Sequence, residues 1–104
     1  MSERRVVVTG IGVVSPIGND KDTLWKNLIE GRSGIRRFQA FDSSAYDCKI
    51  AGEVRDFDPV QYFKSAKDAR RADRFTQFAM AAAKMAVADS GIDLEQTDRN
   101  RFGV

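Results

Sequence analysis

The side chains with the most versatile reaction chemistry are scarce in this chain of 104 residues, which has one cysteine and no histidine. The cysteine, Cys48, lies in the segment AYDCKIAG between Asp47 and Lys49. A catalytic thiolate needs a helix N-terminus or a neighbouring base to lower its pKa, and this sequence context indicates neither. We therefore interpret Cys48 as a small structural residue in a loop or at a strand edge, and we assign no catalytic residue.

The scarcity of cysteine and histidine also limits the metal and disulfide sites that the chain can form. One cysteine cannot form an internal disulfide. Without a histidine or a C-x-x-C pair, the sequence offers no structural zinc site. We expect no bound metal and no cofactor.

Several carboxylates gather in the middle of the chain, where paired acids could in principle act as general acid and base. They lie in irregular or strand-end sequence, in which such residues more commonly form turns and helix caps. We interpret them as turn and cap residues. The group comprises Asp42, Asp47, Glu53, Asp56 and Asp58.

A basic run gives the chain its candidate binding surface. In helical register its members fall three to four residues apart on one side, which would suit acidic side chains or a carrier that bears phosphopantetheine. Asp68 and Asp73 interrupt the run. From the residues alone, a solvated helix face with internal ion pairs is therefore favoured. The run comprises Lys64, Lys67, Arg70, Arg71 and Arg74.

Two glycines near the N-terminus raise the question of a nucleotide-binding loop. Gly10 and Gly12 follow an apolar run, but Ser15 occupies the third glycine position of G-x-G-x-x-G and Pro16 comes next. The sequence also has no Gly-Lys-Ser/Thr triplet. A structural role is favoured, in which Gly10 and Gly12 let another backbone or a large side chain approach closely.

The apolar run itself, RRVVVTGIGVV, predicts a strand from Arg4 to Val14 that is apolar on both faces and ends in a turn at Ser15–Gly18. A helix through Thr23–Ile29 should follow, with Asn19 or Asp22 as its N-cap and Gly31 at its end.

The next segments predict short elements. Arg32–Ser44 has no clear period, so we expect an irregular connection whose Ile35, Phe38 and Phe41 dock onto other parts. Lys49–Val54 is expected to form a strand. Asp58 as N-cap and Pro59 at the first helical position predict a short helix, Val60–Phe63.

A long helix is then predicted from about Ser65 or Asp68 to a stop at Gly91. Between Phe78 and Ala88 its only polar residue is Lys84, which is typical of a helix buried inside a large protein. So short a chain cannot cover that surface. Phe102–Val104 resembles the start of another strand, and we expect a fragment or one part of an assembly.

The composition indicates a soluble globular protein, with 42% hydrophobic and 31% charged residues. The net charge of +2 is too small and too evenly spread to indicate nucleic-acid binding. There is no apolar run near 18 residues and no signal-peptide pattern. We expect a cytoplasmic protein with no membrane and no nucleic-acid partner.

Four segments together carry a family resemblance. They are RRVVVTGIGVVSPIGND, LWKNLIEGRSGI, FDSSAYDCKIAGEVRDFDP and DARRADRFTQFAMAAAKMAVADSGI. In this order they closely resemble the start of the β-ketoacyl-acyl carrier protein synthases, the elongation condensing enzymes of fatty acid synthesis, and most closely the type II synthase. The resemblance implies that residues 1–104 open an α/β, thiolase-like fold of layered helices and mostly parallel sheets, usually assembled as a homodimer.

The resemblance also implies an acyltransferase activity for the complete enzyme. In the family, a cysteine accepts an acyl group as a thioester and two histidines assist decarboxylation of malonyl-acyl carrier protein in a Claisen condensation. That Cys-His-His set would lie beyond Val104, so we expect this segment to be inactive alone. Family members dock the acidic helix of acyl carrier protein on a basic patch, and Lys67, Arg70 and Arg71 fall at the matching places.

Three alternatives remain. The chain could be a non-catalytic carrier-protein binding module, or a ketosynthase domain of a polyketide synthase, which shares this opening pattern. The start of the chain at Met1, just before the apolar run, favours a stand-alone synthase over an embedded domain. A nucleotide-binding domain is a weaker third alternative.

Overall fold

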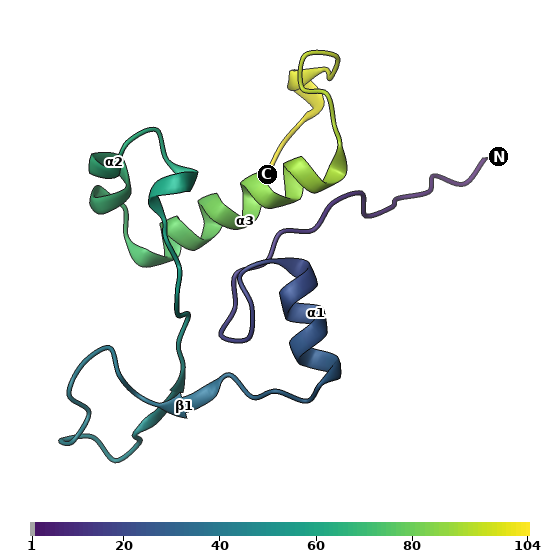
Figure 1. Cartoon of the computed structure of the whole chain (residues 1–104). Helices are drawn as coiled ribbons and strands as arrows, with labels where there is room; N and C mark the ends of the chain where they lie inside the picture. Colours follow the sequence, from purple (N-terminus) through teal and green to yellow (C-terminus); the bar gives the residue numbers. More distant parts are fainter. Residues whose placement is uncertain (1) are drawn as a thin grey trace.

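Helix α3 forms the centre of the computed structural model, which describes residues 2–104 (Figure 1). Its sequence is rich in alanine, methionine and other good helix formers. It ends at Gly91, whose φ of 67° is left-handed and whose N–H donates to the carbonyl of Ala88, as the sequence predicted. In chain order the elements are α1 (Lys21–Ile29), β1 (Ile35–Arg37), β2 (Ile50–Gly52), the 3₁₀ helix η1 (Val60–Tyr62), α2 (Ala66–Arg71), α3 (Arg74–Ser90) and the 3₁₀ helix η2 (Arg99–Arg101).

The predicted single long helix is wrong, because the chain turns a corner between α2 and α3. Ala72 and Asp73 are extended, with ψ values of 139° and 157°. The side chain of Gln77 donates to the carbonyls of Ala69 and Ala72, and so supplies hydrogen bonds that a continuous helix would have made within its backbone. The helix is thus divided at a point with no glycine or proline to mark it.

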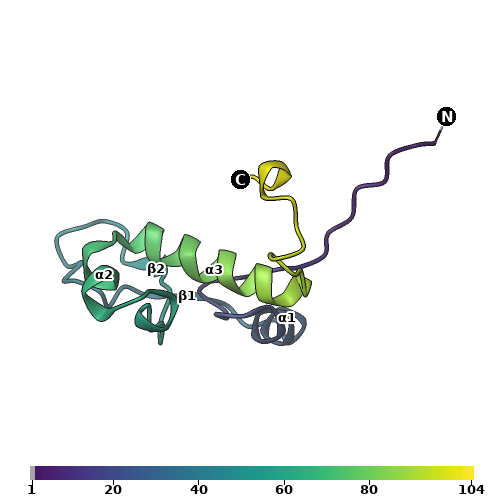
Figure 2. The same cartoon turned by 90° about the horizontal axis from the view of Figure 1, so that it is seen from above.

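The predicted strand Arg4–Val14 is also not formed within the described residues. The segment is extended but has no hydrogen-bonded neighbouring strand among residues 2–104, and Val6 is 96% exposed. Figure 2 shows the N-terminal end of this stretch projecting from the body of the molecule. A strand is stabilised by the ladder to an adjacent strand, so an apolar sequence alone does not produce one. The turn at Ser15–Gly18 is confirmed by hydrogen bonds in both directions between these two residues.

The close approach expected at the two N-terminal glycines is confirmed. A Cβ atom built on Gly12 would lie 2.8 Å from the Ala86 nitrogen, and one on Gly10 would lie 2.7 Å from the Ser90 nitrogen. Both glycines therefore let the N-terminal stretch lie directly against the backbone of α3.

Helix α1 is capped by Asp20, not by Asn19 or Asp22 as predicted. The Asp20 carboxylate accepts from the Thr23 N–H at 2.8 Å. Asn19 is already engaged, since its amide donates to the Arg55 carbonyl at 3.0 Å. The positive φ of Gly31, 71°, agrees with the predicted end of the helix.

A small antiparallel hairpin joins β1 to β2, with Arg36 opposite Ala51. β2 confirms the centre of the predicted strand Lys49–Val54, but β1 lies in the segment expected to be irregular. Its three residues are too few to show a period. Of the three residues predicted to dock, Phe38 and Phe41 pack against each other with ring centres 4.2 Å apart, and Phe41 meets Tyr46 at 5.8 Å. Ile35 and Phe41 nevertheless remain more than half exposed.

The remaining short elements differ from prediction in detail. η1 confirms the short helix after residue 58, as a 3₁₀ turn in which Pro59 occupies the cap position. The Asp58 carboxylate accepts from the Val60 N–H at 3.0 Å. Phe102–Val104 forms no strand in the described residues and lies exposed after η2.

The described residues bury little. Ala69 and Ala81 are the buried hydrophobic residues, at 1% and 0% exposure. The accessible surface is 8689 Å², whereas a compact monomer of this mass exposes roughly 5,800 Å². The radius of gyration is 17.6 Å, against about 13 Å for a compact domain of this length. The structure thus has an open form.

Helices and strands are both present, as the α/β class requires. The sheet formed by residues 2–104 is antiparallel, so the expected parallel sheet is not assembled from these residues. No helix in this part of the chain is long and apolar enough to cross a membrane.

Candidate functional site

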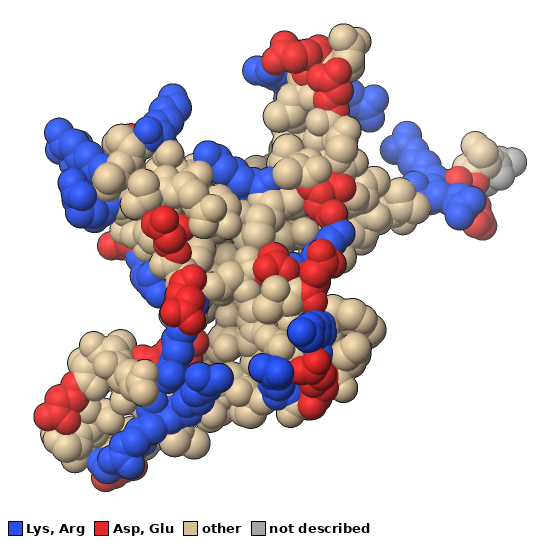
Figure 3. Space-filling view, in the orientation of Figure 1, with Lys and Arg blue, Asp and Glu red and all other residues tan. Residues whose placement is uncertain are grey.

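The three basic residues predicted to bind a partner lie together on α2. We call Lys67, Arg70 and Arg71 the basic cluster. All three are exposed, while Ala69 on the same helix is buried. In Figure 3, blue side chains gather at the upper left, over the position of α2. The short helix therefore presents its charges outward and its alanine inward.

The basic cluster has no internal charge partner. Within residues 2–104, no nitrogen of Lys67, Arg70 or Arg71 forms an ion pair with a carboxylate. The backbone N–H of Asp68 donates to the Ser65 hydroxyl at 3.1 Å and so completes the N-cap of α2. The cluster is solvated as expected from the residues alone, but the internal ion pairs expected with it are not formed among residues 2–104.

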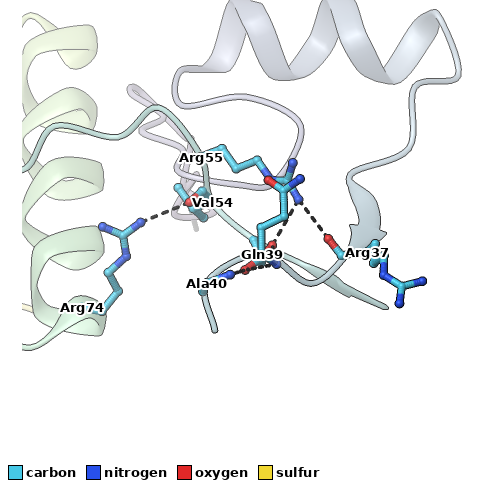
Figure 4. A network of polar contacts seen from close by, with 7 residues as sticks. Arg37, Gln39, Ala40, Val54, Arg55 and Arg74 are labelled. Carbon is cyan, nitrogen blue, oxygen red and sulfur yellow. Dashed lines mark hydrogen bonds and ion pairs between the residues drawn. The ribbon is translucent and has the colours of Figure 1, made fainter. Parts of the chain in front are cut away.

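Arg74 does not belong to this surface, although it continues the basic run in sequence. Its guanidinium lies 4.9 Å from the ring centre of Phe78 and 5.5 Å from that of Phe57. It also donates to the Val54 carbonyl at 3.1 Å (Figure 4). Although Arg74 is exposed, these contacts engage its guanidinium within the chain and join the start of α3 to the segment after β2.

The corner that holds α2 contains a residue that sequence analysis missed. Gln77 Nε2 donates to the Ala69 carbonyl at 2.8 Å and to the Ala72 carbonyl at 3.4 Å. The signal was hidden because a single long helix would have placed Gln77 on its own surface, with its side chain free.

An aromatic cluster supports the same corner from η1. The rings of Phe57 and Tyr62 stack with centres 6.0 Å apart, and Phe57 meets Phe78 of α3 edge-on at 5.3 Å. η1 contacts both α2 and α3. The basic cluster is therefore held from two sides, by polar contacts at the corner and by aromatic packing beneath η1.

Glu53 organises the loop between β1 and β2. Its carboxylate accepts from the Ala40 N–H at 2.9 Å and the Gln39 N–H at 3.1 Å, and it pairs with Arg55 at 3.1 Å (Figure 4). Loss of water around the carboxylate acts to raise its pKa, but the two N–H groups and the guanidinium outweigh this and hold the pKa of Glu53 below its ordinary value.

Of the five carboxylates predicted to be turn and cap residues, Asp42 and Asp58 have the expected local contacts. Asp42 accepts from the Ser44 N–H at 3.0 Å, and that contact lowers its pKa. Glu53 differs from this prediction, because its backbone partners Gln39 and Ala40 lie 14 and 13 residues away in sequence. The structure places Cys48 in the exposed loop before β2, with its Sγ 3.4 Å from the Ile50 carbonyl oxygen.

The two N-terminal glycines do not form a phosphate cradle. Gly10 and Gly12 face the backbone of α3, and even a Cβ atom would clash there. The close approach of the two segments uses the space that a pyrophosphate would need. This geometry disfavours the nucleotide-binding alternative.

Comparison with known proteins places these features in a family. Residues 3–104 match the family described as "Beta-ketoacyl synthase, N-terminal domain". Two proteins named 3-oxoacyl-[acyl-carrier-protein] synthase 2, from Coxiella burnetii and Vibrio harveyi, are each 46% identical over 104 residues, covering all of this chain and 25% of each relative. The protein of the same name from Staphylococcus aureus (strain COL) is 43% identical over 101 residues, or 97% of this chain and 24% of that protein.

A comparison with a solved structure agrees with this family match. The ishigamide ketosynthase/chain length factor matches with a TM-score of 0.78 and 38% identity, over 90% of this chain and 23% of that one. The chain thus spans about a quarter of the length of the curated relatives it matches. From the family match and these identities, the chain belongs to the β-ketoacyl synthase family, in the part that forms its N-terminal domain.

Proposed function

We propose that the protein is a 3-oxoacyl-acyl carrier protein synthase, an acyltransferase that elongates fatty acids by decarboxylative condensation of an acyl thioester with malonyl-acyl carrier protein. The 41–46% identity to proteins named 3-oxoacyl-[acyl-carrier-protein] synthase 2 supports this activity. In this proposal residues 1–104 contribute scaffold and part of the carrier-protein docking surface.

The chemistry of residues 1–104 supports a scaffold and docking role in place of a catalytic one. They contain no histidine, and their one cysteine is exposed with a carbonyl oxygen as its hydrogen-bond partner. A carbonyl oxygen is neither the base nor the cation that activates a nucleophilic cysteine. We therefore propose that these residues are inactive alone and that the reacting groups are supplied by polypeptide outside them.

The apolar surface supports a scaffold role. Phe75 on α3 is 72% exposed, and Val6 and Val8 in the N-terminal stretch are 96% and 82% exposed. Soluble monomers rarely expose apolar patches of this extent. We propose that this surface is covered in the complete, thiolase-like fold, in a cytoplasmic homodimer.

The observation that carries the docking proposal is the unpaired basic cluster on α2. Three exposed cations without a carboxylate partner form a positive surface suited to an acidic helix. We propose that acyl- and malonyl-loaded acyl carrier protein docks at Lys67, Arg70 and Arg71.

The structural match favours a second candidate function. The neighbour with a TM-score of 0.78 is a ketosynthase/chain length factor, which favours a ketosynthase of polyketide assembly. A non-catalytic carrier-protein binding module is a further alternative, which the exposed apolar surface disfavours.

The experiment is a condensation assay with the full-length protein, a saturated acyl primer and malonyl-acyl carrier protein. The proposal predicts a 3-oxoacyl-acyl carrier protein extended by one two-carbon unit, with release of carbon dioxide. Repeated extension without reduction would favour the polyketide candidate, and carrier binding without any product would favour the binding module.

A further inference from the structure

We propose that Gln77 is the positioning residue that fixes α2, and with it the basic cluster, relative to α3. The inference rests on the proposed function, because it gives the orientation of α2 a role in docking. Its basis is a pair of contacts between the first turns of α3 and the carbonyl end of α2.

Helix α2 needs support from outside itself. It has six residues, and a helix this short is not stable through its own hydrogen bonds. Its last carbonyl groups also have no partner within the helix. Ala69 O receives the Ala72 N–H at 3.3 Å, and the contacts from Gln77 supply the further donors at this end.

Gln77 is suited to this task by its place and by its chemistry. It lies one turn into α3, and its own N–H donates to the Asp73 carbonyl at 3.0 Å, so its backbone is fixed by the longer helix. A primary amide carries two N–H groups on one nitrogen, which matches the two carbonyl acceptors. The contacts are partly shielded from water, where the loss of a donor is costly.

The basic cluster lies at the end of α2 that Gln77 holds. Arg70 and Arg71 stand between the two carbonyl acceptors in sequence, and Lys67 lies one turn earlier. Ala69, whose carbonyl accepts from Gln77, is 1% exposed and anchors the inner face of the helix. A change of angle at this corner would therefore shift all three cations relative to the rest of the protein.

The test compares Gln77→Leu and Gln77→Glu with a matched control, Gln96→Leu, in the full-length protein. Leucine removes both donors at similar volume, and glutamate places a carboxylate against two carbonyl oxygens. Gln96 is an exposed glutamine after α3, remote in sequence from this corner. Because Gln77 is changed in two different ways, the test still gives an answer if one of these two variants fails to fold.

Two readouts separate positioning from general stability. Hydrogen exchange of the α2 amides should be about three to ten times faster in Gln77→Leu, as expected for the loss of a shielded hydrogen bond. The KM for acyl carrier protein substrates should rise by a similar factor of about three to ten. The kcat of Gln77→Leu with a carrier-free acyl thioester should be unchanged. In Gln96→Leu, neither the hydrogen exchange of α2 nor the KM should change.

The outcomes distinguish this inference from the proposed function. Unchanged exchange in α2 would overturn the role of Gln77. Faster exchange with an unchanged KM would overturn the link to docking, provided that charge reversal of the basic cluster does raise the KM. If charge reversal also leaves the KM unchanged, the docking proposal itself fails, whereas faster exchange still supports Gln77 as the residue that holds α2.

Discussion

Asp89, near the end of α3, forms an ion pair with Lys21 at the start of α1. The same carboxylate accepts from the Ile11 N–H at 3.0 Å. One side chain of α3 thus joins two segments that lie far from it in sequence, the N-terminal stretch and α1. In an open structure with two buried alanines, such polar links define how the segments are arranged.

This contact predicts a specific pH dependence. The Lys21 ammonium and the Ile11 N–H lower the pKa of Asp89 from 3.8, and Asp89 raises the pKa of Lys21 from 10.5. The stabilisation is therefore present above pH 3.8 and lost as pH falls through the lowered pKa. At the other extreme, it is lost as pH rises through the raised pKa of Lys21.

The measurement is the pH dependence of the thermal unfolding temperature for the full-length protein, as the Asp89→Asn variant and as the wild type. We expect the variant to be less stable at neutral pH and the difference to shrink on acidification below the lowered pKa. A difference that stays constant down to low pH would contradict the role of the Asp89 charge. Asp47→Asn, on the exposed loop before β2, is the control.

Gly12→Ala tests the close approach of the N-terminal stretch to α3. The added Cβ would lie 2.8 Å from the Ala86 nitrogen and nearer still to the Ala82 carbonyl. Because these are backbone atoms, we expect the free energy of unfolding to fall by about 1–3 kcal/mol. Urea unfolding of the full-length protein measures the change, and Gly103→Ala, which meets nothing within 4 Å among the described residues, should have no such effect. Equal stability of the two variants would show that the segments are not in contact.

Arg74→Ala tests the structural role of that arginine. The variant loses contacts with the Phe57 and Phe78 rings and with the Val54 carbonyl. We expect a loss of about 1 kcal/mol in the free energy of unfolding. Arg70→Ala is the matched control, since Arg70 is exposed and unpaired in the described residues. The assignment fails if Arg70→Ala destabilises as much as Arg74→Ala.

The apolar surface predicts the behaviour of residues 1–104 produced alone. With Val6, Val8 and Phe75 largely exposed, this chain should bind the dye ANS and lack a cooperative thermal transition. The full-length protein should bind little dye and unfold cooperatively. Cooperative unfolding of the short chain without dye binding would instead favour an independent binding module.

Local sequence signals predicted the fold well where the cause is itself local. Gly91 ends α3 through a left-handed φ that glycine adopts easily, and Gly10 and Gly12 admit a neighbouring backbone. The family was also recognisable, because several characteristic segments occur in order. These features depend on residue type and spacing more than on distant contacts.

The failures have non-local causes. The run from Arg4 to Val14 has the composition of a buried strand, but pairing needs a neighbour that residues 2–104 do not provide. The corner at Ala72–Asp73 carries no glycine or proline, and it is stabilised by Gln77 from the next helix. The missed cap Asp20 is an exception, because its contact with the Thr23 N–H is local.

The same reasoning applies to the candidate site. The positions of Lys67, Arg70 and Arg71 were predicted from spacing and resemblance, and the structure places them together on one short helix. The role of Arg74 was not predictable, because its partners come from Val54, Phe57 and Phe78. Only the three-dimensional structure distinguishes a cation that contacts other parts of the same chain from one that has no such contact.

The most direct test of the account is the affinity of the full-length protein for acyl carrier protein at low salt, where electrostatic contacts are least screened. Lys67, Arg70 and Arg71 would be changed together to Glu. A control with the same change in net charge carries Glu at Lys26, Arg36 and Arg101, which are exposed elsewhere. We predict that the cluster variant loses most of its affinity while the control keeps it. Equal affinity of the cluster variant and the wild type at low salt would contradict the account.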